Sequence, residues 1–136
     1  MNTPGKTQLP MANLPVKDVE QTRQFYTDMG FRPNEGHKSE QLTSFFAGDN
    51  NLVVHFFQED IFKKHSAGAA ANLNKGNEVM FTIAANSREE VNTWAEQVKK
   101  AGGSIFAEPA ELQNNWYGCG FADPEGHKWN VFYNGK

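Results

Sequence analysis

Alternation of apolar and polar positions near the C-terminus predicts a β-strand with two different faces. Within residues 128–133, Trp129, Val131 and Tyr133 point to one side, and the residues between them point to the other. The preceding segment, 123–126, reads Asp-Pro-Glu-Gly, in which Pro fixes one turn angle and Gly permits another. A tight turn followed by a two-faced strand has to pack into a larger sheet.

Two amphipathic helices are predicted from apolar stripes that follow cap residues. Asp18 is expected to cap the first helix, with Gln21 at the reciprocal capping position and Gly30 at the end of the helix. Ser87 and Glu90 form a capping box at the start of the second helix. The apolar stripes are Val19, Phe25, Tyr26 and Met29 in the first helix and Val91, Trp94, Ala95 and Val98 in the second.

Further strand patterns surround these helices and repeat in the same order. They cover residues 11–16, 41–47, 52–57, 79–84, 104–107 and 116–121. Residues 48–51 predict a hairpin turn, and Pro109 is expected to interrupt the strand that begins at residue 104. Residues 1–9 are expected to form a loose tail, and the Ala-, Gly- and Asn-rich segment 59–76 a linker with one helical turn near 61–64.

The chain therefore holds two copies of a strand–helix–strand–strand–strand unit, at residues 10–58 and 77–135, within one domain over residues 1–136. One helix cannot cover the apolar face of such a sheet alone. We expect an α+β fold in which two βαβββ modules form a curved mixed sheet. The helices would lie on its outer face, and a cleft would lie between the modules.

Composition narrows the class of protein. The 136 residues are 38% hydrophobic and 12% aromatic, which is typical of a packed globular domain. The net charge of −3, with no basic stripe, argues against nucleic acid as a partner. Cys119 is the single cysteine, so a reducing, cytoplasmic setting is expected. The polar N-terminus does not resemble a signal peptide, and no apolar run predicts a membrane span.

Two motifs resemble the vicinal oxygen chelate superfamily, which includes glyoxalase I, bleomycin-resistance proteins and extradiol dioxygenases. The first motif is Leu-Pro-Val-Lys-Asp at 14–18 followed by Phe25-Tyr26 and Met-Gly-Phe at 29–31. The second is Asp-Pro-Glu-Gly-His at 123–127, before the last strand. The resemblance covers about residues 10–134. It implies paired βαβββ modules with a cleft between them, and a dimer whose pockets lie near the subunit interface.

The resemblance also implies four metal-ligand positions, which here are Met11, His55, Met80 and Asn130. Two thioethers and an amide are poor ligands for Mg, Ni, Zn or Fe, so no metal or other cofactor is expected. The alternative is a divalent metal at a degenerate site, with Glu78 brought in by a shifted match. The thioethers would suit copper(I), but two Met and one His are too few ligands to argue for that ion.

An aromatic-rich cleft is the remaining candidate site, suited to a planar or amphipathic small molecule. The predicted pocket residues are Met11, Asn13, His55, Phe57, Met80, Thr82, Asn130 and Phe132, with Trp116 or Tyr117 depending on register. His55 is either a structurally bonded side chain or a pocket polar group that could act as a general base. Cys119 is expected to be a buried structural thiol, and His127 to be exposed in its turn.

These observations predict a glyoxalase- or bleomycin-resistance-like protein, acting as a homodimer, that binds a small molecule without the metal of the family. The alternative is a metal-dependent glyoxalase-type lyase or isomerase, or a relative of the dioxygenases. A third possibility is a regulatory partner whose cleft is filled by its own side chains. The residues leave open whether the modules pair within one chain or across two chains.

Overall fold

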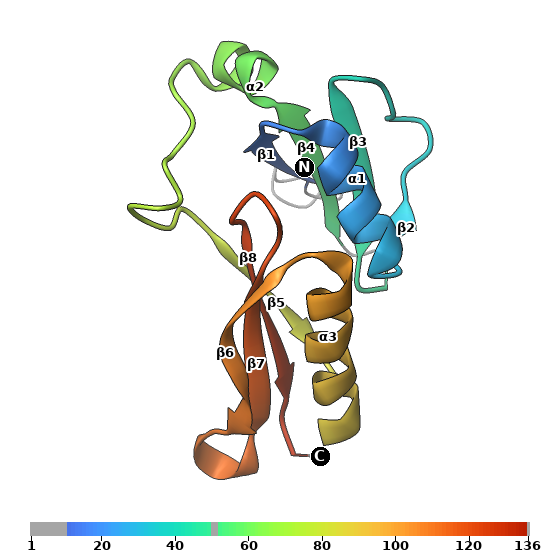
Figure 1. Ribbon diagram of the computed structural model, residues 1–136, viewed down its shortest axis with the longest axis vertical. Helices are drawn as coiled ribbons and strands as arrows, with labels where there is room; N and C mark the ends of the chain where they lie inside the picture. Colours follow the sequence, from blue (N-terminus) through green and yellow to red (C-terminus); the bar gives the residue numbers. More distant parts are fainter. Residues whose placement is uncertain (1–10, 50–51, 136) are drawn as a thin grey trace, which may run out of the picture.

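The computed structural model describes residues 11–49 and 52–135, and it confirms the α+β class and the two βαβββ modules (Figure 1). The elements are β1 (Met11–Val16), α1 (Val19–Asp28), β2 (Arg32–Pro33), β3 (Leu42–Ala47), β4 (Leu52–Gln58), α2 (Glu59–Ser66), β5 (Met80–Ala84), α3 (Arg88–Ala101), β6 (Ser104–Glu111), the 3-10 turn η2 (Gln113–Asn115), β7 (Tyr117–Ala122) and β8 (Lys128–Tyr133). The expected tail and half of the expected hairpin turn lie outside the described residues.

Each module forms one four-stranded sheet, and the two sheets have the same topology. The strand orders are β1-β4-β3-β2 and β5-β8-β7-β6. In each sheet the first strand runs parallel to the last strand of its module, and the other neighbours are antiparallel. The register sets Asn13 opposite His55 in the first sheet and Thr82 opposite Asn130 in the second. The duplication read from the sequence is therefore repeated in strand order and in register.

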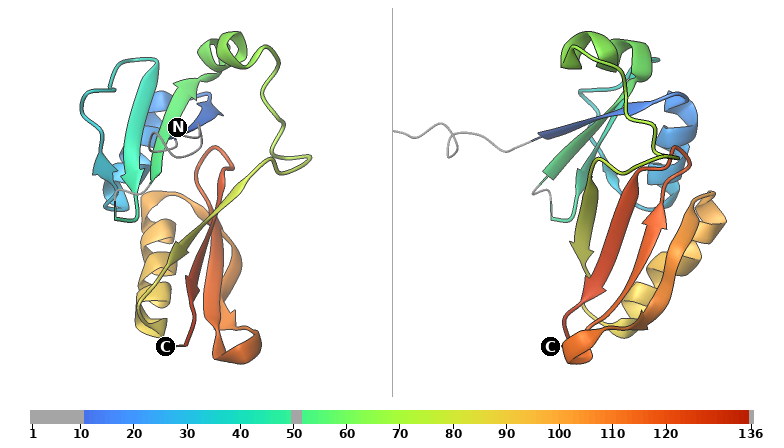
Figure 2. Two further views of the ribbon diagram at one scale, coloured as in Figure 1. Left: turned by 180° about the vertical axis from the view of Figure 1, so that it is seen from behind. Right: turned by 90° about the vertical axis from the view of Figure 1, so that its left-hand side faces the viewer.

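The two modules share one aromatic core on the helix side of the sheets. Figure 2 shows α1 and α3 on the same side of both sheets. Trp129 of β8 is 1% exposed and donates its indole N–H to the hydroxyl oxygen of Tyr26 on α1 at 3.0 Å. Phe31 lies edge-on to both Trp129 and Trp94, with ring centroids 5.3 and 5.9 Å apart. Because these rings come from both modules, burying them stabilises the packing of one module against the other.

The turn between β7 and β8 holds the start of α1. The two carboxylate oxygens of Glu125 accept the backbone N–H groups of Lys17 and Asp18, each at 2.9 Å. Asp18 in turn accepts the N–H of Gln21, as predicted for the cap. The reciprocal bond expected from the Gln21 side chain is made by Glu125 instead, so that expectation was wrong. A helix in the first module thus takes one of its caps from the second.

His127 is buried at 3% exposure, and the expectation that it lies exposed was wrong. Its Nε2 lies 2.7 Å from the carbonyl oxygen of Pro15, to which it donates. The neighbouring Asp123 accepts the Tyr26 hydroxyl at 2.7 Å and the N–H groups of Glu125 and His127 at 2.9 Å. Turn residues are often exposed, but this turn packs against the β1–α1 junction, more than 100 residues away in the sequence.

Two local expectations were only partly correct. β6 continues through Pro109 to Glu111, with shifts in register between Ile105 and Ala107 and between Ala107 and Ala110. Because β6 is an edge strand, its irregular pairing accommodates a residue without an N–H. The single turn expected near 61–64 is a complete helix, α2, and Gln58 caps it through the N–H of Asp60.

Within the described residues, no helix is both long and apolar enough to cross a membrane.

Candidate functional site

We call the side of each sheet that faces away from α1 and α3 its open face. Val54 and Phe56 of β4, and Trp129 and Val131 of β8, enter the core, so the residues that alternate with them face outward. The predicted site residues on the open faces are Met11, Asn13, His55 and Phe57 in the first module and Met80, Thr82, Asn130 and Phe132 in the second. Their alternation fixes where they lie, and their role in ligand binding stays a prediction.

His55 is a buried polar group of the first open face. Its side chain is 6% exposed, and its Nε2 lies 3.2 Å from the sulfur of Met11. Its Nδ1 is buried without a hydrogen-bond partner among the described residues. Burial, followed by the nearby charge of His37, lowers the pKa of His55 below 6.5. The ring is therefore neutral at pH 7 and offers one N–H donor and one lone pair.

The second open face has a glycine floor covered by apolar side chains. A Cβ atom added at Gly120 would lie 2.5 Å from the ring of Phe106, and one added at Gly118 would lie 3.5 Å from Leu112. Gly120 therefore lets Phe106 lie directly on the backbone of β7, whereas the close approach at Gly118 is to the carbonyl oxygen of Val131, at 2.7 Å. The ammonium group of Lys128 lies 5.7 Å from the centroid of the Phe106 ring. The floor is thus occupied by the side chains of the chain itself.

Trp116 and Tyr117 lie on opposite sides of the second sheet. Trp116 is edge-on to Phe132, with ring centroids 5.0 Å apart, and is 39% exposed. The Tyr117 hydroxyl donates to Asn92 of α3 at 2.7 Å, and the Arg88 guanidinium stacks on its ring. Of the two alternatives left by the sequence, Trp116 shares the open face. Tyr117 lies on the helix side because it alternates in step with core residues of β7.

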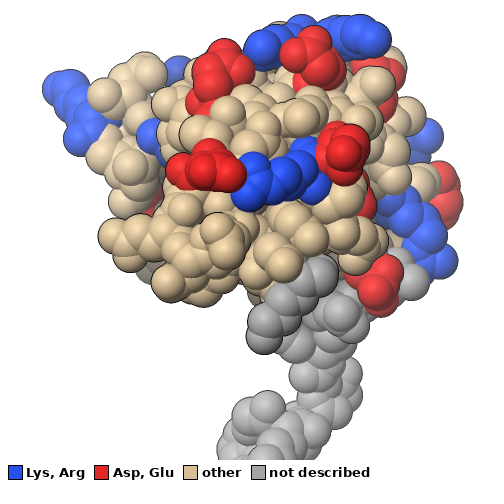
Figure 3. All heavy atoms as spheres, turned by 90° about the horizontal axis from the view of Figure 1, so that it is seen from below, with Lys and Arg blue, Asp and Glu red and all other residues tan. Residues whose placement is uncertain are grey.

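Charges are mixed on the face seen in Figure 3. Lys and Arg side chains there lie among Asp and Glu side chains, and uncharged surface separates these groups. In the second module, Arg88 pairs with Glu111 at 2.8 Å and Lys99 pairs with Glu108 at 3.4 Å. The visible face therefore does not present the continuous basic stripe typical of a nucleic-acid interface.

A family model for the Glyoxalase/Bleomycin resistance protein/Dioxygenase superfamily matches residues 8–131. The chain belongs to this superfamily. Its fold is similar to that of hypothetical protein SA1046 from S. aureus, at 30% identity over 95% of both chains with a TM-score of 0.81. No curated protein matches the sequence significantly.

Two further solved structures share the superfamily fold at lower identity. A glyoxalase-related enzyme from Fulvimarina pelagi is 19% identical over 93% of this chain and 88% of its own, with a TM-score of 0.78. A lactoylglutathione lyase from Agrobacterium tumefaciens is 19% identical over 93% of both chains, with a TM-score of 0.69. Likeness at this level of identity concerns the fold and does not transfer an activity.

The side chains at the four superfamily metal positions do not fit a divalent ion. Met11 and His55 lie together on the first sheet, whereas Met80 and Asn130 belong to the second. In the part of the chain that the structure describes, no three His, Cys, Asp or Glu side chains are grouped so that they could hold a metal ion. Glu78 becomes a possible ligand if the match to the superfamily metal positions is shifted along the second module, and it lines a cavity with Met80 and Lys128. The donor set is therefore one imidazole with thioethers and an amide, which binds hard or borderline cations poorly.

Cys119 does not provide a nucleophile for superfamily chemistry. Its side chain is 2% exposed and points toward the carbonyl oxygen of Val91 at 3.9 Å. Burial, with a smaller contribution from the charge of Glu108, raises its pKa to about 11. The thiol stays protonated at neutral pH and packs as a small apolar group, which confirms the buried thiol predicted from the sequence.

The cavities formed by the described residues include three of more than about 300 Å³, and Met80 is the predicted site residue that lines one of these three. A cavity of about 840 Å³ lies between the β1–α1 turn, the segment 69–74 and the β7–β8 turn. One of about 310 Å³ lies between Phe31 and Trp94, and one of about 420 Å³ lies beside Met80 and Phe106. These three cavities do not bring the predicted site residues together, and large side chains of the second open face such as Met80 and Trp116 stay exposed.

Proposed function

We propose that the protein binds a small aromatic or amphipathic molecule on its open sheet faces, without the divalent metal used by metal-dependent members of the superfamily. The observation that carries this proposal is the apolar surface of the second module. Met80 is 53% exposed, Phe106 is 50% exposed and Trp116 is 39% exposed. Monomeric soluble proteins rarely leave such a group of large apolar side chains uncovered unless it serves binding.

The open faces offer both stacking and polar contacts to such a ligand. Trp116, held edge-on by Phe132, provides an aromatic surface. The amides of Asn13 and Asn130 and the neutral ring of His55 provide a few donors and acceptors around the apolar surface. This combination of apolar walls with sparse polar groups is typical of sites for small organic molecules.

A second copy of the chain completes the site in this proposal. Met11 is 57% exposed on the first open face, and Leu112 is 48% exposed over the second. Two open faces turned toward each other would remove these side chains from water and enclose a pocket between subunits. The protein is accordingly proposed to act as a homodimer in a reducing, cytoplasmic setting. Sedimentation of the full chain at micromolar concentration tests the dimer, and a monomer at all concentrations would contradict it.

The metal-dependent lyase, isomerase or dioxygenase alternative has less support. It requires one ion to be held by His55, Glu78 and the weakly coordinating amide of Asn130, a set with a single imidazole and a single carboxylate. Metal analysis of protein purified without chelator distinguishes the two hypotheses. Stoichiometric Ni, Zn or Fe, together with turnover of the methylglyoxal–glutathione adduct, would favour the alternative.

A thermal-shift screen in the presence of EDTA tests the main proposal. We expect planar aromatic or glycopeptide-like compounds to raise Tm in the wild-type protein and to lose this effect in Trp116→Ala. Tyr117→Phe is the control because residue 117 follows Trp116 in the sequence but points to the opposite side of the sheet, where it bonds Asn92. No stabilisation by any compound, or equal loss in both variants, would contradict binding on the open face.

A further inference from the structure

Met11 and His55 form an unusual polar contact on the first open face. The sulfur of Met11 lies 3.2 Å from Nε2 of His55, although a thioether is only a weak hydrogen-bond acceptor. The other ring nitrogen of His55 is buried and has no partner among the described residues. Neither tautomer of the ring therefore finds a strong hydrogen-bond partner. Buried imidazoles are normally satisfied, so this arrangement calls for an explanation other than packing.

His37 brings a second imidazole to the same place. Its ring centroid lies 5.2 Å from that of His55. Two imidazoles bound to one ion through nitrogen–metal bonds of about 2.0 Å have centroids about 5–6 Å apart. The sequence placed His37 in a loop without functional signal, because nothing in its pattern shows that the loop folds back onto β4.

The loop that carries His37 is held at both ends. Asn34 donates its backbone N–H to the carbonyl of Ser44 at 2.9 Å and its side-chain amide to the Ser44 hydroxyl at 3.2 Å. Ser44 lies directly opposite His55 in the sheet register. The loop therefore starts beside the imidazole that it approaches.

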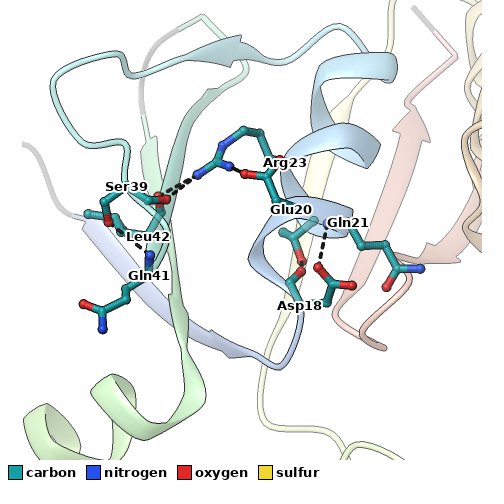
Figure 4. A network of polar contacts seen from close by, with 8 residues as sticks. Asp18, Glu20, Gln21, Arg23, Ser39, Gln41 and Leu42 are labelled. Carbon is teal, nitrogen blue, oxygen red and sulfur yellow. Dashed lines mark hydrogen bonds and ion pairs between the residues drawn. The ribbon is translucent and has the colours of Figure 1, made fainter.

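Arg23 holds the other end of the loop. Its Nη2 reaches from α1 to the carbonyl oxygens of Ser39 and Leu42, at 2.6 and 3.0 Å, while its Nη1 pairs with Glu20 (Figure 4). A guanidinium that bonds two carbonyls fixes the loop more firmly than a single contact does. The position of His37 beside His55 is thus built into the fold.

We propose that Met11, His37 and His55 form a binding site for a soft monovalent metal ion, of the copper(I) class. Thioether and imidazole ligands suit copper(I) and silver(I), whereas the divalent ions of the superfamily favour carboxylates and imidazoles. The ligand set differs from the superfamily positions because His37 replaces the residues of the second module. The inference goes beyond the proposed small-molecule function and does not depend on it.

The chemistry of the bound state is simple ligation. The neutral His55 ring donates the Nε2 lone pair, His37 donates one ring nitrogen, and the Met11 sulfur donates a lone pair. No bond breaks and no electron is transferred when an ion already in the monovalent state binds.

Silver(I) titration of the full chain tests the site, with bicinchoninate-buffered copper(I) under anaerobic conditions as a second probe. We expect one equivalent to bind, and Met11→Leu and His37→Gln each to weaken binding by about tenfold or more. Met11 is 57% exposed and His37 lies in a surface loop, so both variants should fold. Nuclear magnetic resonance should show that the ring signals of His37 and His55 shift with silver while those of His65 and His127 do not.

Matched controls decide whether these three side chains are the ligands. Met80→Leu replaces an exposed methionine of the second sheet, and His65→Gln replaces a histidine whose ring lies against Phe57. Both controls should bind silver(I) as the wild-type chain does. The proposal is overturned if the wild-type chain binds no stoichiometric silver(I), if Met80→Leu loses as much affinity as Met11→Leu, or if zinc(II) displaces silver(I) at equal concentration.

Discussion

The two open faces share one backbone plan but carry different chemistry. The first face has a buried imidazole beside a thioether and a second imidazole, with His55 only 6% exposed. The second face has glycines under Phe106 and leaves Met80 53% exposed. Strand order and register therefore decide which residues face outward, while side-chain size and polarity decide what each face can bind. Duplication of the fold did not duplicate the site.

The helices of the two modules differ in the same way. Ser87 and Glu90 from within its own module cap α3, and Glu90 accepts the N–H of Asn86. At α1, Asp18 accepts the N–H of Gln21 as Ser87 does for Glu90, but the acceptor of the N–H groups of Lys17 and Asp18 is Glu125, which lies in the other module. The first module thus depends on the second for the start of its helix, whereas the second does not depend on the first in this respect.

The largest effect on the free energy of unfolding is expected from a substitution in the core that the two modules share. Trp129→Ala should lower the free energy of unfolding by about 3–5 kcal/mol because it leaves a large cavity and removes the donor to Tyr26. Trp116→Ala on the open face should cost less than about 1 kcal/mol, since this ring is 39% exposed. Urea denaturation measures both. Equal losses would show that the open face is as important to stability as the common core.

An intermediate effect on the free energy of unfolding is expected at the start of α1, which is capped by Glu125 of the second module. Glu125→Ala removes the acceptor of two backbone N–H groups at the start of α1 and should cost about 1–2 kcal/mol. Glu90→Ala removes the acceptor of a single N–H at the start of α3 and should cost less. Urea denaturation of both variants gives the comparison. If Glu90→Ala were the more damaging of the two, the dependence of the first module on the second would be wrong.

The smallest effect concerns the pH dependence of stability and comes from His55. Folding lowers the pKa of His55, so the unfolded chain binds more protons at this residue below pH 6.5. The contribution of His55 to stability is therefore full above pH 6.5 and is lost as the pH falls toward the lowered value. His55→Gln should flatten the stability profile in that window relative to the wild-type chain. A His55→Gln profile that falls as steeply as that of the wild-type chain in this window would contradict the lowered pKa of His55.

The fold was largely predictable from the sequence because local patterns carry it. The alternation around Trp129 and the apolar stripe around Trp94 predict a strand and a helix that the structure contains. The side of the sheet on which Tyr117 lies could also have been predicted, since Tyr117 alternates in step with Cys119 and Phe121, two residues of the core. The prediction did not use this alternation, and it kept Trp116 and Tyr117 as alternatives.

Contacts between segments that lie far apart in the sequence were not predictable from local patterns. The burial of His127 depends on Pro15, and the cap of α1 depends on Glu125, across more than 100 residues. Similarly, the approach of His37 to His55 depends on a loop fixed by Arg23. Sequence periodicity gives the face on which a side chain lies, but it does not give the partner that a distant segment brings to that face.

The most direct test of the central claim is a crystal structure of protein purified without chelator, with anomalous data collected at the zinc, nickel and iron edges. We predict a homodimer with organic density against Trp116 and Phe132, and no divalent ion at Met11, His55, Met80 or Asn130. A divalent ion bound by these residues, or a dimer interface closed over the open faces with no room for a ligand, would contradict the account.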